Sequence, residues 1–241
     1  MTTTIATRLR ILVASIVTVG ISLPAIALSA DAVIRATTTD MPAEAPSSPA
    51  WTKVPLHRVT LTTAPVVHPS NPGKGATARE LTVQAVRNSD QLFIRLDWPD
   101  KRADRKIANI NQFTDGVAVQ FAIERDPETS VLMGGGGKLV DVWHWTASKD
   151  RAQNFIADGF GTLTPMEKQA VSAKSQYANG RWTVVFRRSL KAADESGVKF
   201  VGVQGSGGSA VYPVAFAVWD GSNGEIDGFK AVTMAWQQLA F

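Results

Sequence analysis

Cysteine is absent from the 241-residue sequence, and histidine occurs only three times, as His57, His68 and His144. Without thiols the chain forms no disulfide bond, thiolate-bound zinc site, cysteine-ligated iron–sulfur cluster or C-x-x-C-H attachment of c-type haem. The histidines form no H-E-x-x-H or H-x-x-x-H pair, and no G-x-S-x-G motif occurs. The sequence therefore gives no support to a zinc enzyme or a serine hydrolase.

Long apolar runs are missing after residue 30, so we expect no later segment to cross a membrane as a helix. Before that point Arg8 and Arg10 precede a mostly apolar segment, residues 11–28, and small residues follow. This layout is typical of a secretory signal peptide, so we expect residues 1–30 to be removed and the mature protein to be periplasmic. An uncleaved anchor helix is the alternative, because residues 11–28 could just span a bilayer.

A strong net charge is also lacking. The full chain carries +4, and loss of residues 1–30 leaves 23 basic and 21 acidic side chains, a net charge of +2. The basic residues are scattered and form no stripe, so nothing indicates nucleic-acid binding. A hydrophobic fraction of 44% and a charged fraction of 19% are typical of a folded globular chain.

Short runs with strand character dominate the rest of the chain. They lie at 81–86, 92–98, 117–123, 139–145, 182–186, 198–203, 211–219 and 231–236. Most alternate between apolar and polar residues, and residues 87–90 look like the turn of a hairpin. Helix is expected only at 150–156 and 165–174. The sequence therefore predicts an all-β fold, an antiparallel β-sandwich with a few short helices in its connections.

Residues 31–50 differ from this pattern because they are rich in proline, alanine and threonine and show no apolar period. Such a composition is typical of a tether, so we expect a flexible lead-in over 31–50. The folded domain is then expected to comprise residues 51–241, a length sufficient to bury one large core.

A methionine followed by four glycines stands out, at the start of the VLMGGGGKLVDVWHW stretch of residues 131–145. The thioether of Met133 is a soft ligand that suits haem iron, and glycines let a backbone approach a flat group closely. Met133 could equally fill a gap in the core. His144 alternates with Trp143 and Trp145 and is expected on the opposite face of the strand, more as a strand residue than as a ligand. His57 and His68 are expected at the surface.

Three motifs carry a resemblance that covers residues 50–241. They are D-G-V-A-V-Q-F at 115–121, the Met133 loop, and W-D-G-S-N-G at 219–224 with the lysine Lys230 after it. In this order they resemble the haem b (gamma) subunit of the type II dimethyl sulfoxide reductase family. That family includes the gamma subunits of ethylbenzene dehydrogenase, dimethylsulfide dehydrogenase, and selenate and chlorate reductases.

The resemblance implies a non-covalent haem b inside a β-sandwich, with Met133 and Lys230 as its axial ligands. Without the resemblance Lys230 would be taken for an ordinary surface lysine. Burial would have to lower the pKa of its amine before the amine could bind iron. Because His144 stands where relatives often have an arginine or another polar residue, His144 remains an alternative second ligand.

The resemblance also implies an electron-transfer role rather than catalysis by this chain. Its partners would be a molybdopterin catalytic subunit, an iron–sulfur subunit and a soluble c-type cytochrome. The substrate and the direction of electron flow would then be properties of the partner chains.

A carbohydrate-binding module is the alternative function, because the sequence is also similar to family 9 binding modules and to the DOMON group. Four tryptophans, Trp143, Trp145, Trp219 and Trp236, could form a stacking platform for sugar rings, although core packing is their usual role. A periplasmic assembly protein without a ligand is a third, weaker interpretation.

Overall fold

The computed structural model describes residues 33–67, 72–126, 128–191, 196–200 and 210–241. The expected signal peptide at 1–30 and His68 lie outside the described residues. Within the described ranges, no helix combines the length and the hydropathy that a membrane span requires.

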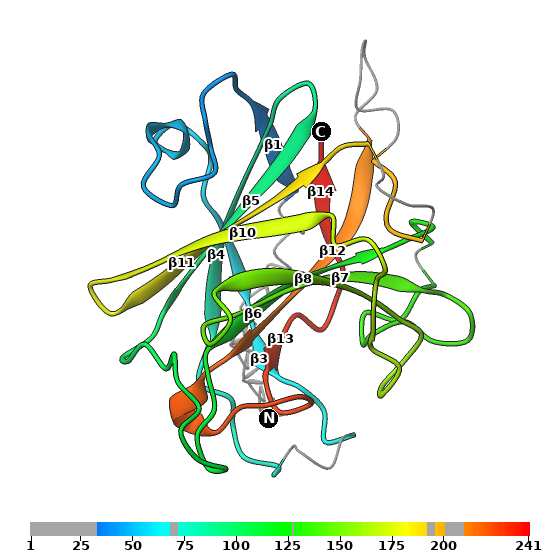
Figure 1. Cartoon of the computed structure of the whole chain (residues 1–241). Coiled ribbons are helices and arrows are strands. Elements are labelled where there is room, and N and C mark those ends of the chain that lie inside the picture. The colour runs from blue at the N-terminus through cyan, green and yellow to red at the C-terminus, as the bar shows by residue number, and fades with distance from the viewer. Residues whose placement is uncertain (1–32, 68–71, 127, 192–195, 201–209) are drawn as a thin grey trace, which may run out of the picture. The chain divides into compact units, whose positions relative to one another are not determined.

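The regular secondary structure of the described residues consists of strands and two short 3-10 helices (Figure 1). The strands are β1 (Ile34–Thr38), β2 (His57–Thr60), β3 (Thr62–Thr63), β4 (Glu80–Arg87), β5 (Gln91–Pro99), β6 (Gly116–Ala122), β7 (Val140–Thr146), β8 (Arg151–Ala157), β9 (Thr164–Pro165), β10 (Val171–Ala178), β11 (Arg181–Ser189), β12 (Val211–Trp219), β13 (Ala231–Val232) and β14 (Gln237–Ala240). The 3-10 helices are η1 (Pro49–Trp51) and η2 (Gly221–Asn223). The predicted all-β fold is confirmed.

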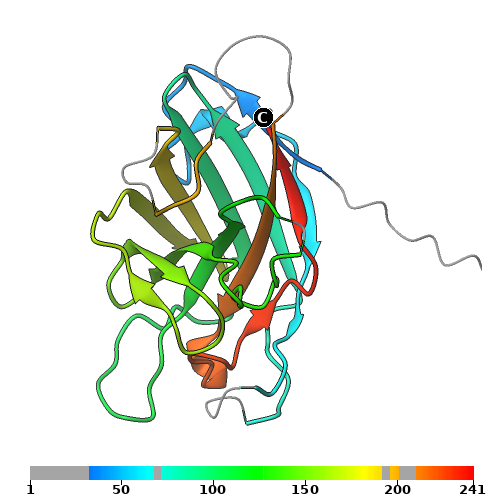
Figure 2. The ribbon, with the colours of Figure 1, turned by 90° about the vertical axis from the view of Figure 1, so that its right-hand side faces the viewer.

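Two layers of strands form the sandwich. The first sheet has the order β10-β11-β5-β4, with β2 also paired to β4. The second has the order β14-β12-β6-β7-β8-β9, with β13 paired to both β12 and β3. β1 joins them, because it pairs in parallel with β14 through Ile34 and Arg35 and with β4 through residues 36–38. Figure 2 shows β1 and β14 side by side at this seam. The result is one curled sheet, antiparallel except at β1.

Aromatic side chains fill the space between the layers. Trp98, Trp145 and Trp182 are fully buried and contact one another, with ring centroids 4.9 to 6.5 Å apart. Trp143 packs against Phe121 at 4.9 Å. Because side chains alternate along a strand, Trp143 and Trp145 in the core place their neighbour His144 on the outer face of the second sheet.

The helices predicted at 150–156 and 165–174 are wrong, since these segments form β8, β9 and the start of β10. A tight turn returns the chain beside β7, with Asp150 N donating to Thr146 O at 2.9 Å and Asp150 in the left-handed region. Every residue of β8 then pairs with β7. Residues such as Ala, Gln and Lys favour helices locally, but pairing to an existing sheet edge overrides that weak preference.

The flexible lead-in expected over 31–50 is also wrong, because its described part belongs to the domain. Residues 34–38 form β1, and Ala43 is fully buried. Ala43 and Trp51 form a cluster with Val86, Phe93 and others on the outer face of the first sheet. A few apolar residues suffice to dock a proline-rich segment when a sheet offers an apolar face.

Smaller differences concern the strand ends. Only residues 231–232 of the strand expected over 231–236 form a strand, β13; the chain then bends, and β14 begins at Gln237. Residues 198–200 of the strand expected at 198–203 are not in a strand, and the rest lies outside the described residues. The hairpin turn after β4 is confirmed, with Asn88 N donating to Gln91 O at 3.0 Å.

Replacing Ile34 tests whether the N-terminal segment is part of the core. Ile34 is 1% exposed within the main core cluster, so we expect Ile34→Ala to lower the free energy of unfolding by about 2–5 kcal/mol. Thr38→Ala, at an exposed position of the same strand, is the control and should cost below about 1 kcal/mol. Urea unfolding measures the free energy of unfolding of both variants. Equally small losses in the two variants would mean that the N-terminal segment is a flexible tether.

Candidate functional site

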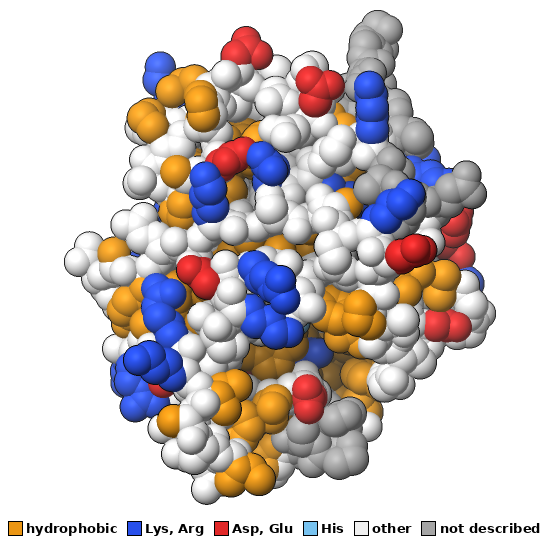
Figure 3. Space-filling model, in the orientation of Figure 1, with side chains coloured by type: hydrophobic (Ala, Val, Ile, Leu, Met, Phe, Trp, Pro, Cys, Tyr) orange, Lys and Arg blue, Asp and Glu red, His pale blue; other side chains and the backbone are white. Residues whose placement is uncertain are grey.

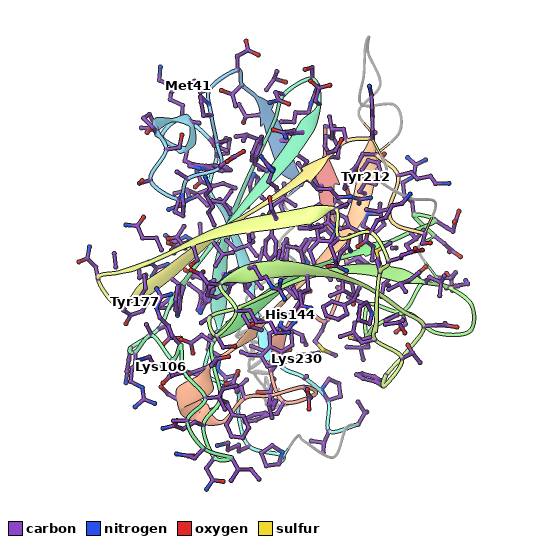
Figure 4. All side chains as sticks on the ribbon, viewed as in Figure 1. Met41, Lys106, His144, Tyr177, Tyr212 and Lys230 are labelled. Atoms are coloured by element: carbon purple, nitrogen blue, oxygen red, sulfur yellow. The ribbon has the colours of Figure 1, made fainter. Side chains whose placement is uncertain are left out.

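A cavity of about 400 Å³ opens on the outer face of the second sheet. Its volume lies in the range of roughly 300–1,000 Å³ that small-molecule sites occupy. Figure 3 shows it as a hollow walled mainly by hydrophobic side chains. Met133, His144 and Lys230, the three candidate ligands, all line it. Figure 4 shows His144 and Lys230 close together there.

Small residues form much of the cavity floor. Gly116 of β6 pairs with Trp219 of β12, and Ala118 of β6 pairs with Ala217 of β12. A Cβ on Gly116 would stand 3.4 Å from His144 Nε2 and 3.5 Å from the Trp219 ring, so a larger residue would crowd both rings. A second cavity of about 50 Å³ reaches Ala118 and Ala217 and shares Met133 and Lys230 with the first. The space beside Met133 and Lys230 therefore extends from the main cavity to Ala118 and Ala217 on the sheet.

Met133 lies in the loop between β6 and β7, held by local hydrogen bonds. Its own φ is +73°, and its carbonyl accepts from Gly159 N at 2.7 Å. Gly134, with φ +75°, donates to Ser130 O, and a Cβ there would stand 2.5 Å from Lys138 O. The four glycines themselves are described and do not line the cavity, so they serve the turn of the loop rather than a close approach to a ligand. That turn presents Met133 to the cavity.

Lys230 directly precedes β13, and its backbone carbonyl accepts from Ala64 N at 2.9 Å. Its Nζ lies 4.8 Å from the centroid of the Trp219 ring. Burial lowers the pKa of Lys230 to about 8, against the opposing charge of Asp227. The amine is therefore much closer to its neutral form at physiological pH than a solvated lysine is, as a nitrogen ligand requires.

His144 stands on β7, on the face opposite the tryptophans, as the alternation predicts. Its ring packs 4.9 Å from the Trp219 ring and 6.3 Å from Phe155. Burial, with the charges of Lys230 and Lys149, lowers the pKa of His144 to about 4. The imidazole is therefore neutral, and its Nε2 lies close to Gly116 at the floor.

Of the other two histidines only His57 is among the described residues, and it does not line the cavity. His57 lies in β2, paired with β4 of the first sheet. It is half-buried rather than fully at the surface, and burial lowers its pKa.

Apolar residues around the mouth are the part of the site that sequence reasoning missed. Ile107, Phe160, Leu163 and Ile226 line the cavity and are 62%, 39%, 41% and 38% exposed. Their signal in the sequence was faint, because they are scattered large apolar residues in loops that show no apolar period. A thioether and an amine inside such apolar walls form a donor set that fits the iron of a flat, largely apolar macrocycle.

Solved structures similar to this chain are β-sandwiches at low identity. A family 9 carbohydrate-binding module of Caldicellulosiruptor kristjanssonii in complex with glucose aligns with a TM-score of 0.48 and 10% identity, covering 86% of this chain and 94% of that one. The cytochrome domain of Myriococcum thermophilum cellobiose dehydrogenase aligns with a TM-score of 0.33 and 11% identity, covering 78% and 81%. Likeness at this level carries no information about a ligand.

Sequence relatives are much closer. The family model described as ethylbenzene dehydrogenase matches residues 48–168 and 162–231. The chlorate reductase subunit gamma of Ideonella dechloratans is 41% identical over 199 residues, 83% of this chain and 80% of that protein. A protein of Haloferax mediterranei named as a respiratory nitrate reductase heme subunit is 35% identical over 81% of this chain and 67% of its own length. The dimethylsulfide dehydrogenase subunit gamma of Rhodovulum sulfidophilum is 33% identical, with coverages of 77% and 71%. The chain therefore belongs to the ethylbenzene dehydrogenase family, among gamma subunits of the kind that its motifs resemble.

Proposed function

We propose that this chain is the haem b electron-transfer subunit of a periplasmic molybdenum oxidoreductase complex. The haem is held without a covalent link, between Met133 and Lys230. The observation that carries the proposal is that these two residues, far apart in the chain, line one apolar cavity of about 400 Å³. The names of the relatives, two gamma subunits and one heme subunit, support the same conclusion.

The residues that line the cavity suit the binding of a haem. Met133 offers a soft thioether, and Lys230 offers an amine whose pKa burial lowers to about 8. Apolar side chains line the mouth, and the small residues Gly116, Ala118 and Ala217 leave space above the sheet. A bound haem supplies one-electron redox chemistry. With Met133 and Lys230 both holding the iron, no protein-free position would remain for a substrate, which would suit electron relay rather than catalysis.

Lys230 is the better second ligand than His144. The imidazole is packed against the Trp219 ring, and its Nε2 lies next to Gly116 at the floor. Lys230 lines both the main and the smaller cavity together with Met133, whereas His144 lines the main cavity only. We assign His144 to the wall, as a neutral aromatic surface beside the ligand.

The partners follow from the relatives, which are named as subunits of chlorate reductase, nitrate reductase and dimethylsulfide dehydrogenase. We propose a molybdopterin catalytic subunit and an iron–sulfur subunit on one side of the electron path. A soluble c-type cytochrome is the proposed partner on the other side. The periplasmic location rests on the signal peptide expected at residues 1–30.

The fold does not favour the carbohydrate-binding alternative. Trp143 and Trp145 are fully buried in the core and cannot stack on a sugar ring. Trp219 and Trp236 are half-buried, and their indole nitrogens donate to Asp227 O and Thr129 O. The proposed four-residue stacking platform is therefore not formed.

Haem reconstitution tests the function directly. We expect the purified mature chain to take up haem and to show b-type bands in a reduced-minus-oxidised spectrum. Acid–acetone extraction should release the haem, because the chain has no cysteine for a thioether link. Calorimetry with soluble glycans should give no heat. A chain without b-type bands that binds a glycan would refute the proposal.

Ligand variants test the axial pair. Met133→Ala and Lys230→Ala should each reduce haem retention or shift the reduction potential, because each removes a donor atom to iron. His144→Ala should leave the position of the bands unchanged. Matched controls are Met234→Ala, 48% exposed, and Lys149→Ala, a lysine at the same cavity. A spectrum altered by the histidine change only would assign His144 as the second ligand.

The pH dependence of haem binding follows from Lys230. Below pH 8 the amine is mostly protonated and has no lone pair, so haem binding must release a proton. The affinity for haem should therefore rise with pH, by up to about tenfold per unit below pH 8, and level off above it. Haem titrations of the wild type and Lys230→Ala measure this slope. An equal slope in both proteins would contradict amine ligation.

A further inference from the structure

Three buried aspartates from separate segments meet at one end of the sandwich, outside the donor set of the cavity. Asp100 follows β5, Asp115 precedes β6, and Asp220 follows β12. They are 7%, 0% and 9% exposed. One carboxylate oxygen from each lies within 4.8 Å of the other two. Three potential negative charges are thus brought together away from solvent.

The three carboxylates differ in how many hydrogen-bond donors they have within the fold. Asp115 accepts from Gly221 N at 2.9 Å, Asp104 N at 2.7 Å and Trp182 Nε1 at 2.8 Å. Asp220 Oδ1 accepts from Asn223 N and caps η2. Asp100 Oδ1 accepts from Arg102 N at 3.0 Å, whereas its Oδ2 is buried without any hydrogen-bond partner in the described structure. A buried acceptor without a donor is rare in folded proteins and points to a missing ligand.

Within the described part of the chain, no lysine or arginine forms a salt bridge that would neutralise these three aspartates. Among the described residues, no ion pair involves Asp100, Asp115 or Asp220. The nearby Arg102 pairs with Asp104 instead, at 2.7 Å. Burial raises the pKa of Asp100 to about 7 and that of Asp115 to about 6, and neighbouring carboxylates add to both effects. Buried charges of this kind are normally paired or coordinate a metal ion.

We propose that Asp100, Asp115 and Asp220 bind a divalent cation, and that the cation is calcium. Calcium takes oxygen ligands at about 2.3–2.6 Å, so two oxygens on one ion can lie up to about 5 Å apart. The 4.8 Å spread of the three oxygens fits this limit. A set of oxygens only favours a hard cation over transition metals, and magnesium would demand stricter octahedral geometry.

The cation fixes the turn that carries part of the cavity wall. Asp115 directly precedes Gly116 of the cavity floor, and Asp220 directly follows Trp219. The turn fits closely, because a Cβ on Gly221 would collide with the Phe113 carbonyl. An ion held by the three acids therefore ties the ends of β5, β6 and β12 together. The proposal rests on the acid cluster only and holds whether or not the cavity takes a haem.

Thermal unfolding of the haem-free mature chain tests the site. After chelator treatment, Ca²⁺ at about a hundredfold excess over its Kd should raise the Tm by roughly 5–10 °C. Tb³⁺ should give tryptophan-sensitised luminescence, because Trp182 Nε1 donates directly to Asp115. Added Ca²⁺ should displace Tb³⁺ and reduce this luminescence.

Variants locate the ion. Asp100→Asn and Asp220→Asn should each lose the Ca²⁺-dependent rise and the luminescence, and Asn at position 220 can still cap η2. Asp126→Asn is the control and should keep both responses, since Asp126 pairs with Lys138 elsewhere. The wild-type titration needs no variant, so it decides the matter even if one variant fails to fold. No response of the wild type to Ca²⁺ and Tb³⁺ would overturn the proposal, and a response to Mg²⁺ only would overturn the choice of calcium.

Discussion

The alternation of side chains along β7 is the constraint on which the site depends. Trp143 and Trp145 point inward and are fully buried, so Val142 and His144 must point outward into the cavity. A slip of one residue in the pairing of β7 with β6 would bring the tryptophans out and the histidine into the core. The core therefore fixes the register of the strands, and the register fixes which side chains face the ligand. The packing of the tryptophans between the sheets therefore determines the geometry of the cavity on the outer face of the second sheet.

The two proposed axial ligands reach the cavity by different means. Met133 depends on a loop in which the left-handed backbone of residues 133–137 turns the chain back on itself. Lys230 depends on the longer turn after β12, where Asp220 caps η2 and Trp219 Nε1 donates to Asp227 O. Trp219 also lies 4.8 Å from the lysine amine. Both donors are thus positioned by hydrogen bonds to backbone groups that do not depend on the ligand, which is how a site is organised before binding.

The sequence predicts those features that depend on neighbouring residues. The alternation of apolar and polar residues predicted the strands around Trp98, Trp143 and Trp182. The pairing of Met133 with Lys230 was implied by the family resemblance, and the structure brings both residues to one cavity. The sequence did not predict β8, because the residues of 151–157 are ambiguous until β7 offers an edge to pair with. Nor did it predict that Ala43 and Trp51 dock on the first sheet, or that Asp100, Asp115 and Asp220 meet. These contacts join residues far apart in the chain, and no local pattern records them.

Because the mouth of the cavity is formed by exposed apolar side chains on loops, binding of a ligand in the cavity should stabilise those loops. Ile107 and Phe160 are 62% and 39% exposed, on loops with no regular secondary structure of their own. Apolar surface in water favours any partner that covers it, so a flat apolar ligand in the cavity would bury part of these side chains. A ligand that binds only the folded state adds RT ln(1 + [L]/Kd) to the free energy of unfolding. The loops should therefore be the region most stabilised by a ligand, whereas the strands, already held by the tryptophan core, should change little.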